Sequence, residues 1–71
     1  MGAIVNRVRE LRMSADMTQQ ALADAVGVSR QTVNAIETGR YSPSLEVALR
    51  IARAFDQPVE GVFWLARESG R

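Results

Sequence analysis

The sequence predicts an all-α domain of five short helices, and two observations support this fold class. Apolar residues recur at the three- and four-residue spacing of amphipathic helices along much of the 71-residue chain. Residues that favour helix starts precede several of these stretches, and a glycine follows two of them. The chain has no cysteine and no histidine, so disulfides and the usual zinc ligand sets do not stabilise it. We therefore expect one domain over residues 1–71, with its core at about residues 6–63.

The first helix is expected from about Asn6 to Ala15. Val8 and Leu11 lie on its apolar side, with charged residues between them. Residues 4–5 either continue this helix or form a short extended arm before it.

The second and third helices are expected over residues 18–26 and 29–38. Thr18 and Ser29 precede them as N-caps, whose side-chain oxygen accepts a free backbone N–H of the first turn. A glycine follows each helix, and glycine commonly ends helices because it adopts the left-handed conformation without steric cost. The sequence therefore predicts two short helices joined by a tight turn.

The fourth helix is expected from Ser44 to Asp56, because serine is a good N-cap and aspartate tolerates the left-handed conformation that ends a helix. It is apolar on nearly every side, and beyond its cap the polar residues form one thin stripe of Glu46, Arg50 and Arg53. A helix with this pattern is covered almost all round, and so short a chain has few elements to cover it. Part of this helix is expected to face a second subunit.

The C-terminal region predicts a short fifth helix that begins at Pro58 and is weakened by Gly61. Residues 63–65 then form a strand-favouring stretch. Because apolar residues gather near both ends of the chain, we expect residues 4–5 to pair with residues 63–65 as a small antiparallel ladder. Residues 66–71 are expected to be a polar tail.

One spacing narrows the second and third helices to a helix-turn-helix. Counting from Gln19, Ala23 stands fifth, Gly27 ninth, Val33 fifteenth and Ile36 eighteenth. A small residue allows two steeply crossing helices to approach closely, and glycine in the turn permits backbone conformations that side chains resist. Val33 and Ile36 turn the third helix inward. This is the motif whose second helix enters the major groove of DNA.

The third helix has a polar side opposite its apolar residues when it is projected at about 100° per residue. That side carries Arg30, Gln31 and Asn34. Arginine and the amide residues read guanine and adenine edges through paired hydrogen bonds. Each residue taken singly is also typical of an ordinary solvated helix face, but the turn spacing favours base reading by all three.

The segments TQQALADAVGVS, ETGRYSPSLE and RIARAF are similar to the Cro/C1-type helix-turn-helix family of bacterial and phage transcriptional regulators. The resemblance runs from about Arg7 to Phe63 and implies the five-helix, lambda-repressor-like fold. The chain departs from the family pattern at Asp56, where glycine is common, and at Gly61, where an acidic residue is typical. The resemblance also implies phosphate contacts by Gln19, Ser29, Thr38, Arg40 and Tyr41.

Two charged residues are expected to act inside the protein. Glu37 projects within about 40° of Val33 on a helical wheel, so it borders the core and does not reach DNA. We expect a structural salt bridge between Arg12, on the first helix, and Glu37, as family members often have at these positions.

The function that we expect is a sequence-specific DNA-binding transcriptional regulator, a repressor that binds a palindromic operator as a homodimer. The net charge is only +1, so phosphate neutralisation has to be local. The dimer interface is expected to comprise Val47, Ile51, Phe63, Trp64 and Leu65. One alternative is an antitoxin-like protein whose main partner is another protein, and another is a structural dimer module without a DNA role.

Several other functions are not expected. The chain shows no catalytic constellation and no clustering of acidic residues typical of a metal site. It also lacks the ~20 consecutive apolar residues that span a bilayer. We therefore expect no enzymatic activity, cofactor, metal, small-molecule ligand or membrane partner, and a cytoplasmic location.

Overall fold

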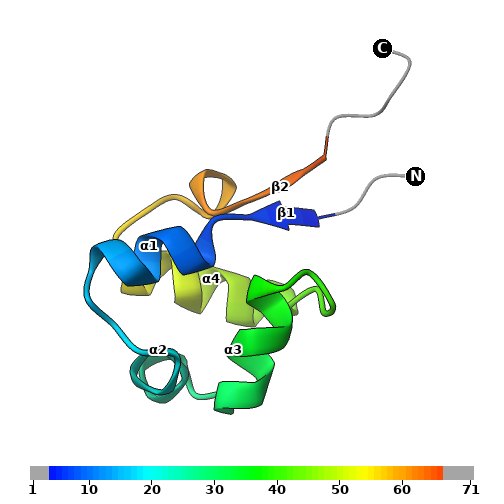
Figure 1. Cartoon of the computed structure of the whole chain (residues 1–71). Coiled ribbons are helices and arrows are strands. Elements are labelled where there is room, and N and C mark those ends of the chain that lie inside the picture. The colour runs from blue at the N-terminus through cyan, green and yellow to red at the C-terminus, as the bar shows by residue number, and fades with distance from the viewer. Residues whose placement is uncertain (1–3, 67–71) are drawn as a thin grey trace.

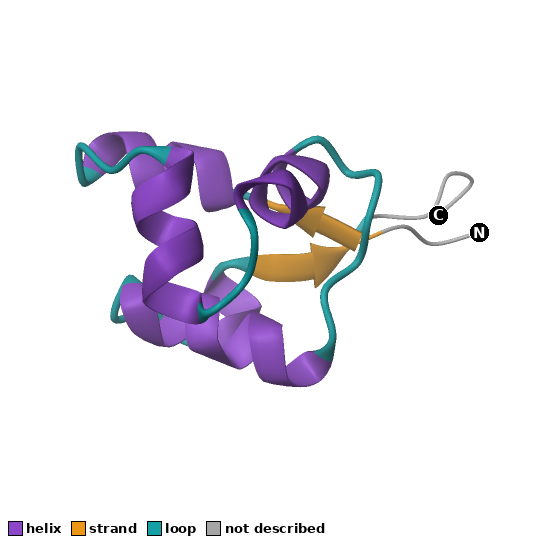
Figure 2. Cartoon of the chain, turned by 90° about the horizontal axis from the view of Figure 1, so that it is seen from below, coloured by secondary structure: helices purple, strands orange, loops and turns teal. Residues whose placement is uncertain are grey.

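The structure is a computed structural model that describes residues 4–66. Its elements in chain order are β1 (Ile4–Asn6), α1 (Val8–Ser14), α2 (Gln19–Val26), α3 (Arg30–Glu37), α4 (Leu45–Ala54), the 3-10 helix η1 (Val59–Gly61) and β2 (Phe63–Leu65). The helices form one cluster, and the two strands lie side by side at its edge (Figure 1; Figure 2). None of the helices within residues 4–66 has the length and apolar character needed to cross a bilayer.

Side-chain caps fix the starts of α2, α3 and α4. In each case a hydroxyl oxygen accepts the backbone N–H of the residue three positions on, which has no partner within the helix. The distances are 2.9 Å from Ala21 to Thr18, 3.1 Å from Thr32 to Ser29 and 3.2 Å from Val47 to Ser44. The three predicted N-caps are therefore confirmed.

Residues in the left-handed conformation follow most of the helices. Gly27 and Gly39 both have a φ of 79°, which glycine adopts without steric cost. A Cβ at residue 39 would meet no atom within 4 Å, so the need for glycine there is conformational. Asp56 has a φ of 55° after α4, as predicted, and Asp16 has a φ of 56° after α1. The sequence pattern did not single out Asp16.

One cluster of buried apolar side chains holds the helices together. All four α-helices and β2 contribute to it through Val8, Leu22, Ala23, Val26, Val33, Ile36, Ala48, Ile51, Ala52, Val62 and Phe63. Ile51 has no exposed surface, and Phe63 is 9% exposed. The predictions that Ile51 and Phe63 contribute to a subunit interface are therefore wrong, because the protein's own core already covers both side chains.

The predicted ladder between the two ends of the domain is confirmed. The strands pair antiparallel, with Ile4 opposite Leu65, Val5 opposite Trp64 and Asn6 opposite Phe63. The ladder brings residues from both ends of the chain to one side of the helical cluster (Figure 1). Of the predicted polar tail, residues 67–71 lie outside the described residues.

The first helix starts later than predicted, because Asn6 belongs to the strand. The Asn6 Nδ2 group donates to the backbone carbonyl of Ile36 at 3.0 Å, and its Oδ1 atom accepts the backbone N–H of Val8 at 3.0 Å. One side chain thus ties the strand to the end of α3 and satisfies a free donor at the start of α1.

The predicted fifth α-helix is only the three-residue 3-10 helix η1, so the described chain has four α-helices rather than five. The reason lies in contacts with the start of α1. The Val62 carbonyl accepts the backbone N–H of Arg7 at 3.1 Å, and the Gly61 carbonyl accepts the Arg7 Nε–H at 2.7 Å. These bonds use carbonyls that a longer helix would need for itself and lead the chain into β2.

Candidate nucleic-acid interface

The outer side of α3 is polar and exposed. Arg30, Gln31 and Asn34 all lie in solvent, whereas Val33 and Ile36 on the same helix are 1% and 0% exposed. The Ser29 cap places Arg30 and Gln31 in the first turn, and Asn34 follows one turn later. The helix therefore presents three side chains of the kind that read base edges, and it is fixed from behind by the core.

Gln19 joins the start of α2 to α3. Its half-buried side chain donates from Nε2 to Glu37 Oε1 at 3.1 Å and to Asn34 Oδ1 at 3.3 Å. The residue expected to anchor a phosphate is thus also bonded to one of the three residues expected to read bases.

The hydroxyl groups of Ser29 and Thr38 are both occupied within the helix. The Thr38 hydroxyl lies 2.9 Å from the carbonyl of Asn34 and 3.2 Å from that of Ala35, and it donates to them. Ser29 Oγ accepts the Thr32 N–H as an N-cap and lies 3.0 Å from the Thr32 hydroxyl. The Thr38 hydroxyl would have to turn its proton outward to donate to a phosphate, whereas the Ser29 oxygen keeps its cap bond whichever way its proton points.

Arg40 and Tyr41 follow α3 in a turn that is held by backbone bonds. Their N–H groups both donate to the carbonyl of Ala35, at 2.9 and 3.3 Å. Both side chains are exposed. Tyr41 borders a shallow depression of about 270 Å³, which is lined by Ser29, Gln31, Thr32, Ala35 and Tyr41.

The ion pair expected between Arg12 and Glu37 is formed. The Nε–Oε2 distance is 2.6 Å and the Nη2–Oε1 distance is 3.2 Å, which makes the pair bidentate. The side chains are 13% and 3% exposed. The Arg12 Nη1 atom also donates to the carbonyl of Met17 at 2.8 Å. The hydrogen bond with Glu37 raises the pKa of Arg12 above its ordinary value, so the guanidinium stays charged and links α1 to α3.

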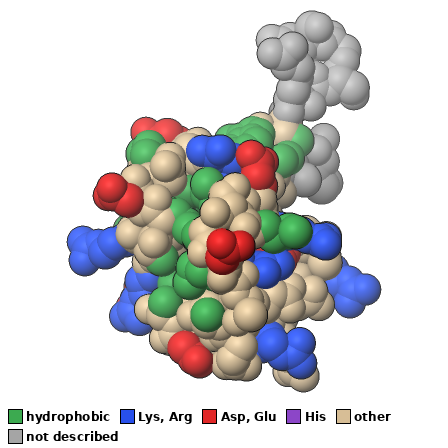
Figure 3. All heavy atoms as spheres, turned by 60° about the vertical axis from the view of Figure 1, so that its left-hand side comes forward, with side chains coloured by type: hydrophobic (Ala, Val, Ile, Leu, Met, Phe, Trp, Pro, Cys, Tyr) green, Lys and Arg blue, Asp and Glu red, His purple; other side chains and the backbone are tan. Residues whose placement is uncertain are grey.

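The charges on the surface do not form one large basic patch on the face that Figure 3 shows. Acidic and basic side chains alternate there with apolar ones (Figure 3). Ion pairs within residues 4–66 engage Arg7, Arg12 and Arg50. Arg30 and Arg40 are in none of these pairs, so their charges are available to an anion.

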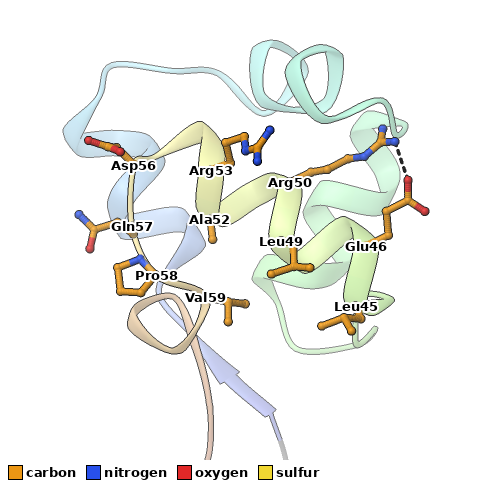
Figure 4. A pocket seen from close by; sticks show the side chains of 10 residues that line it. All are labelled: Leu45, Glu46, Leu49, Arg50, Ala52, Arg53, Asp56, Gln57, Pro58 and Val59. Carbon is orange, nitrogen blue, oxygen red and sulfur yellow. Dashed lines mark hydrogen bonds and ion pairs between the residues drawn. The ribbon is translucent and has the colours of Figure 1, made fainter.

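A second surface feature lies beside α4. A groove of about 870 Å³ runs between this helix and the segment at residues 57–59, with Leu45, Leu49, Ala52 and Val59 among its lining residues (Figure 4). Leu45 is 72% exposed and Leu49 is 49% exposed. The sequence pattern does not single out these two leucines, because a helix that is apolar on nearly all sides does not reveal which side faces outward.

The ladder carries further exposed apolar side chains. Trp64 is 42% exposed and Leu65 is 70% exposed, and Ile4 and Val5 on β1 are 40% and 37% exposed. Val47, the remaining member of the expected interface, is half-buried against the core. Within residues 4–66, no three acidic side chains gather in the way that metal ligands do.

Comparison with known proteins decides the family. A family model described as helix-turn-helix matches residues 8–62. The chain belongs to the Cro/C1-type helix-turn-helix family of transcriptional regulators. The family assignment that the sequence motifs predict is thereby confirmed.

The relatives of this helix-turn-helix protein span bacteria, archaea and phages. It is 52% identical to the uncharacterized HTH-type transcriptional regulator YgzD of Bacillus subtilis, over 90% of this chain and 97% of that protein. It is 33% identical to the cryptic phage CTXphi transcriptional repressor RstR of Vibrio cholerae, over 76% of this chain and 49% of RstR. The crystal structure of the restriction-modification controller protein C.AhdI from Aeromonas hydrophila is also similar. It has a TM-score of 0.73 and 34% identity, over 78% of this chain and 83% of that one.

Proposed function

We propose that this helix-turn-helix regulator is a repressor that binds a palindromic operator as a homodimer, with α3 in the major groove. The observation that supports this most is the division of α3 into an exposed polar side and a buried apolar side. A rigid helix with exposed arginine and amide side chains suits the width of the major groove and its pattern of donors and acceptors.

In this proposal Arg30, Gln31 and Asn34 contact base edges. Arg30 and Gln31 lie in the first turn of α3, and recognition helices of this motif contact bases mainly through their N-terminal residues. Arg30 has no ion-pair partner within residues 4–66, so it meets a guanine or a phosphate without first breaking an internal bond.

Phosphate contacts are assigned to the residues that flank these readers: Gln19, Ser29, Thr38, Arg40 and Tyr41. Gln19 contributes its backbone N–H at the start of α2, because both of its Nε2 protons are bonded to Glu37 and Asn34. Arg40 carries the largest share, because its charge is exposed and its backbone is fixed by the bond to Ala35. The Thr38 hydroxyl contributes after its proton turns away from the carbonyls of Asn34 and Ala35, and Ser29 donates its hydroxyl proton while its oxygen remains the N-cap acceptor.

Dimerisation places two copies of α3 on one face of the duplex, about 34 Å apart. We assign the interface to exposed or half-exposed apolar residues of α4 and β2, namely Leu45, Val47, Leu49, Trp64 and Leu65. A small domain without cysteines, and therefore without disulfides, gains most from burying such a surface against a second copy. The repressor role is proposed because RstR, a relative with 33% identity, is a transcriptional repressor.

A footprinting experiment tests the proposal. The DNA upstream of the protein's own gene is titrated with the wild-type protein, and the mass of the complex is measured by sedimentation. We expect protection of a symmetric site by two protomers, with affinity that falls steeply as salt rises. Equal affinity for that DNA and for a scrambled duplex would refute the proposal.

A second candidate function is an antitoxin-like role with a protein partner, and the groove beside α4 is the observation that favours it. Its lining surface is mostly apolar, and Leu45 and Leu49, which belong to this lining, are well exposed. Stable co-purification with a small protein encoded next to its gene, lost in a Leu49→Glu variant, would support this role over that of a free-standing repressor.

A further inference from the structure

Four side chains from three helices form one continuous series of hydrogen bonds, which we call the relay. Arg12 on α1 donates to Glu37 on α3 at 2.6 and 3.2 Å. Gln19 on α2 donates to Glu37 at 3.1 Å and to Asn34 at 3.3 Å. The relay begins at the Arg12–Glu37 ion pair, which is almost closed off from solvent, and ends at the exposed Asn34 on the polar side of α3. It connects the buried centre of the domain to the surface proposed to read DNA.

The chemistry of these groups determines which group donates and which accepts in every bond of the relay. A guanidinium only donates, and an ionised carboxylate only accepts. Facing the Glu37 carboxylate, the Gln19 side chain has to present its Nε2 group, because its Oε1 atom would meet another acceptor. The second Nε2 proton of Gln19 then points to an acceptor, which is Asn34 Oδ1. The orientation of two amide groups thus follows from the charges at the other end.

We infer that this relay fixes Asn34 as a hydrogen-bond donor toward DNA, and that Glu37 and Gln19 are positioning residues for base specificity. With its Oδ1 atom held by Gln19, Asn34 offers its Nδ2 group to the groove. The inference rests on the proposed function, because it states which base edges this position of α3 selects. Neither Glu37 nor Gln19 has to touch a base for this effect.

A donor at this position distinguishes among the bases. Guanine and thymine present only acceptors in the major groove, whereas cytosine presents only its amino donor. Asn34 therefore favours guanine or thymine at the base that it faces and disfavours cytosine. Adenine presents one donor and one acceptor, so a preference for adenine would not show whether Asn34 donates or accepts.

The decisive variant is Asn34→Asp, which keeps the acceptor for Gln19 and replaces the outward donor by an acceptor. Wild type and variant each select binding sites from a random DNA library, and Asn34→Ala identifies the base pair that residue 34 contacts. We expect wild type to disfavour cytosine there by about threefold to tenfold and Asn34→Asp to prefer cytosine. Cytosine preference in wild type, or an unchanged preference in Asn34→Asp, would overturn the inference.

The relay itself is tested by Gln19→Met with Gln20→Met as the matched control. Gln20 is the exposed neighbour of Gln19, and among residues 4–66 its side chain bonds only to Asp24 on the same helix, at 2.9 Å. We expect Gln19→Met to lose the discrimination at the base facing residue 34 while keeping that of Arg30. Gln20→Met should retain both. A loss of discrimination at all positions, or at none, in Gln19→Met would contradict a positioning role.

A measurement without DNA separates failure of the relay from failure of the proposed function. In the free protein, the side-chain amide protons of Gln19 should exchange with solvent several times more slowly than those of the exposed Gln31. Glu37→Met, which removes the acceptor of the Gln19 Nε2 proton, should remove this protection. Equal exchange for Gln19 and Gln31 would refute the relay. Wild type that selects no DNA sequence would refute the proposed function, and with it the donor role of Asn34, even if the protection is present.

Discussion

Removal of the Glu37 carboxylate should destabilise the domain far more than removal of an exposed carboxylate. Glu37 is 3% exposed and accepts bonds from Arg12 at 2.6 and 3.2 Å and from Gln19 at 3.1 Å. In Glu37→Ala, Arg12 keeps only its bond to the Met17 carbonyl, and its charge remains where solvent barely reaches. Stranding one partner of a buried pair costs about 3 kcal/mol or more.

This loss is large for so small a domain. At about 4–8 °C per kcal/mol for chains of this length, the melting temperature should fall by about 12–24 °C. The matched control is Glu46→Ala, which removes a carboxylate that is 71% exposed and is paired with Arg50 at 2.5 Å. Exposed pairs of this kind contribute about 1 kcal/mol or less, so the control should lose no more than about 8 °C.

The assay is thermal unfolding of both variants and of Arg12→Met/Glu37→Met, followed by circular dichroism. The double variant removes both charges together, so it should be more stable than Glu37→Ala. The reasoning would be refuted if Glu37→Ala and Glu46→Ala shifted the melting temperature equally. It would also fail if the double variant were less stable than Glu37→Ala.

Three further predictions concern backbone conformation, dimerisation and phosphate binding. Gly39→Ala should destabilise the domain by about 1–2 kcal/mol in urea unfolding because residue 39 has a φ of 79°, and an unchanged midpoint would contradict this. Leu49→Glu should shift sedimentation toward the monomer, since Leu49 is 49% exposed and is assigned to the interface; an unaltered dimer would remove α4 from the interface. Arg40→Ala should weaken binding to all DNA sequences alike and reduce the salt slope by about one, so a change confined to one sequence would argue against a phosphate contact.

Local chemistry made the helix starts predictable. Thr18, Ser29 and Ser44 each form the cap that their residue type favours, because a cap needs only a hydroxyl and an N–H three residues away. The inward side of α3 followed in the same way from the spacing of Val33 and Ile36. These features depend on neighbours within one turn of helix.

Contacts between distant segments were not predictable in the same way. The start of α1 and the length of η1 depend on bonds from Asn6 to Ile36 and from Arg7 to Gly61, and periodicity carries no information about such pairs. The prediction of which side of α4 faces outward was wrong for a similar reason. Ile51 and Leu49 are equally apolar, and only the packing of the other helices shows that the first is buried.

The candidate site is predictable from the sequence only in part. The three predicted base-reading residues follow from helical projection, and all three are exposed. The bonds from Gln19 to Glu37 and Asn34 join residues 18 and 15 positions apart, which the motif alone does not reveal. The sequence therefore predicts which side chains face outward, whereas the hydrogen bonds that orient them come from tertiary structure.

The central claim is that the exposed side of α3 determines which DNA sequence is bound. Binding-site selection from a random library tests it most directly, with Arg30→Ala compared with Arg53→Ala, an exposed arginine on α4. We predict that Arg30→Ala loses the preference at one base pair in each half-site, at a cost of about 1–3 kcal/mol per contact. Arg53→Ala should select the wild-type site. Selection of the full wild-type site by Arg30→Ala, Gln31→Ala and Asn34→Ala alike would contradict the claim.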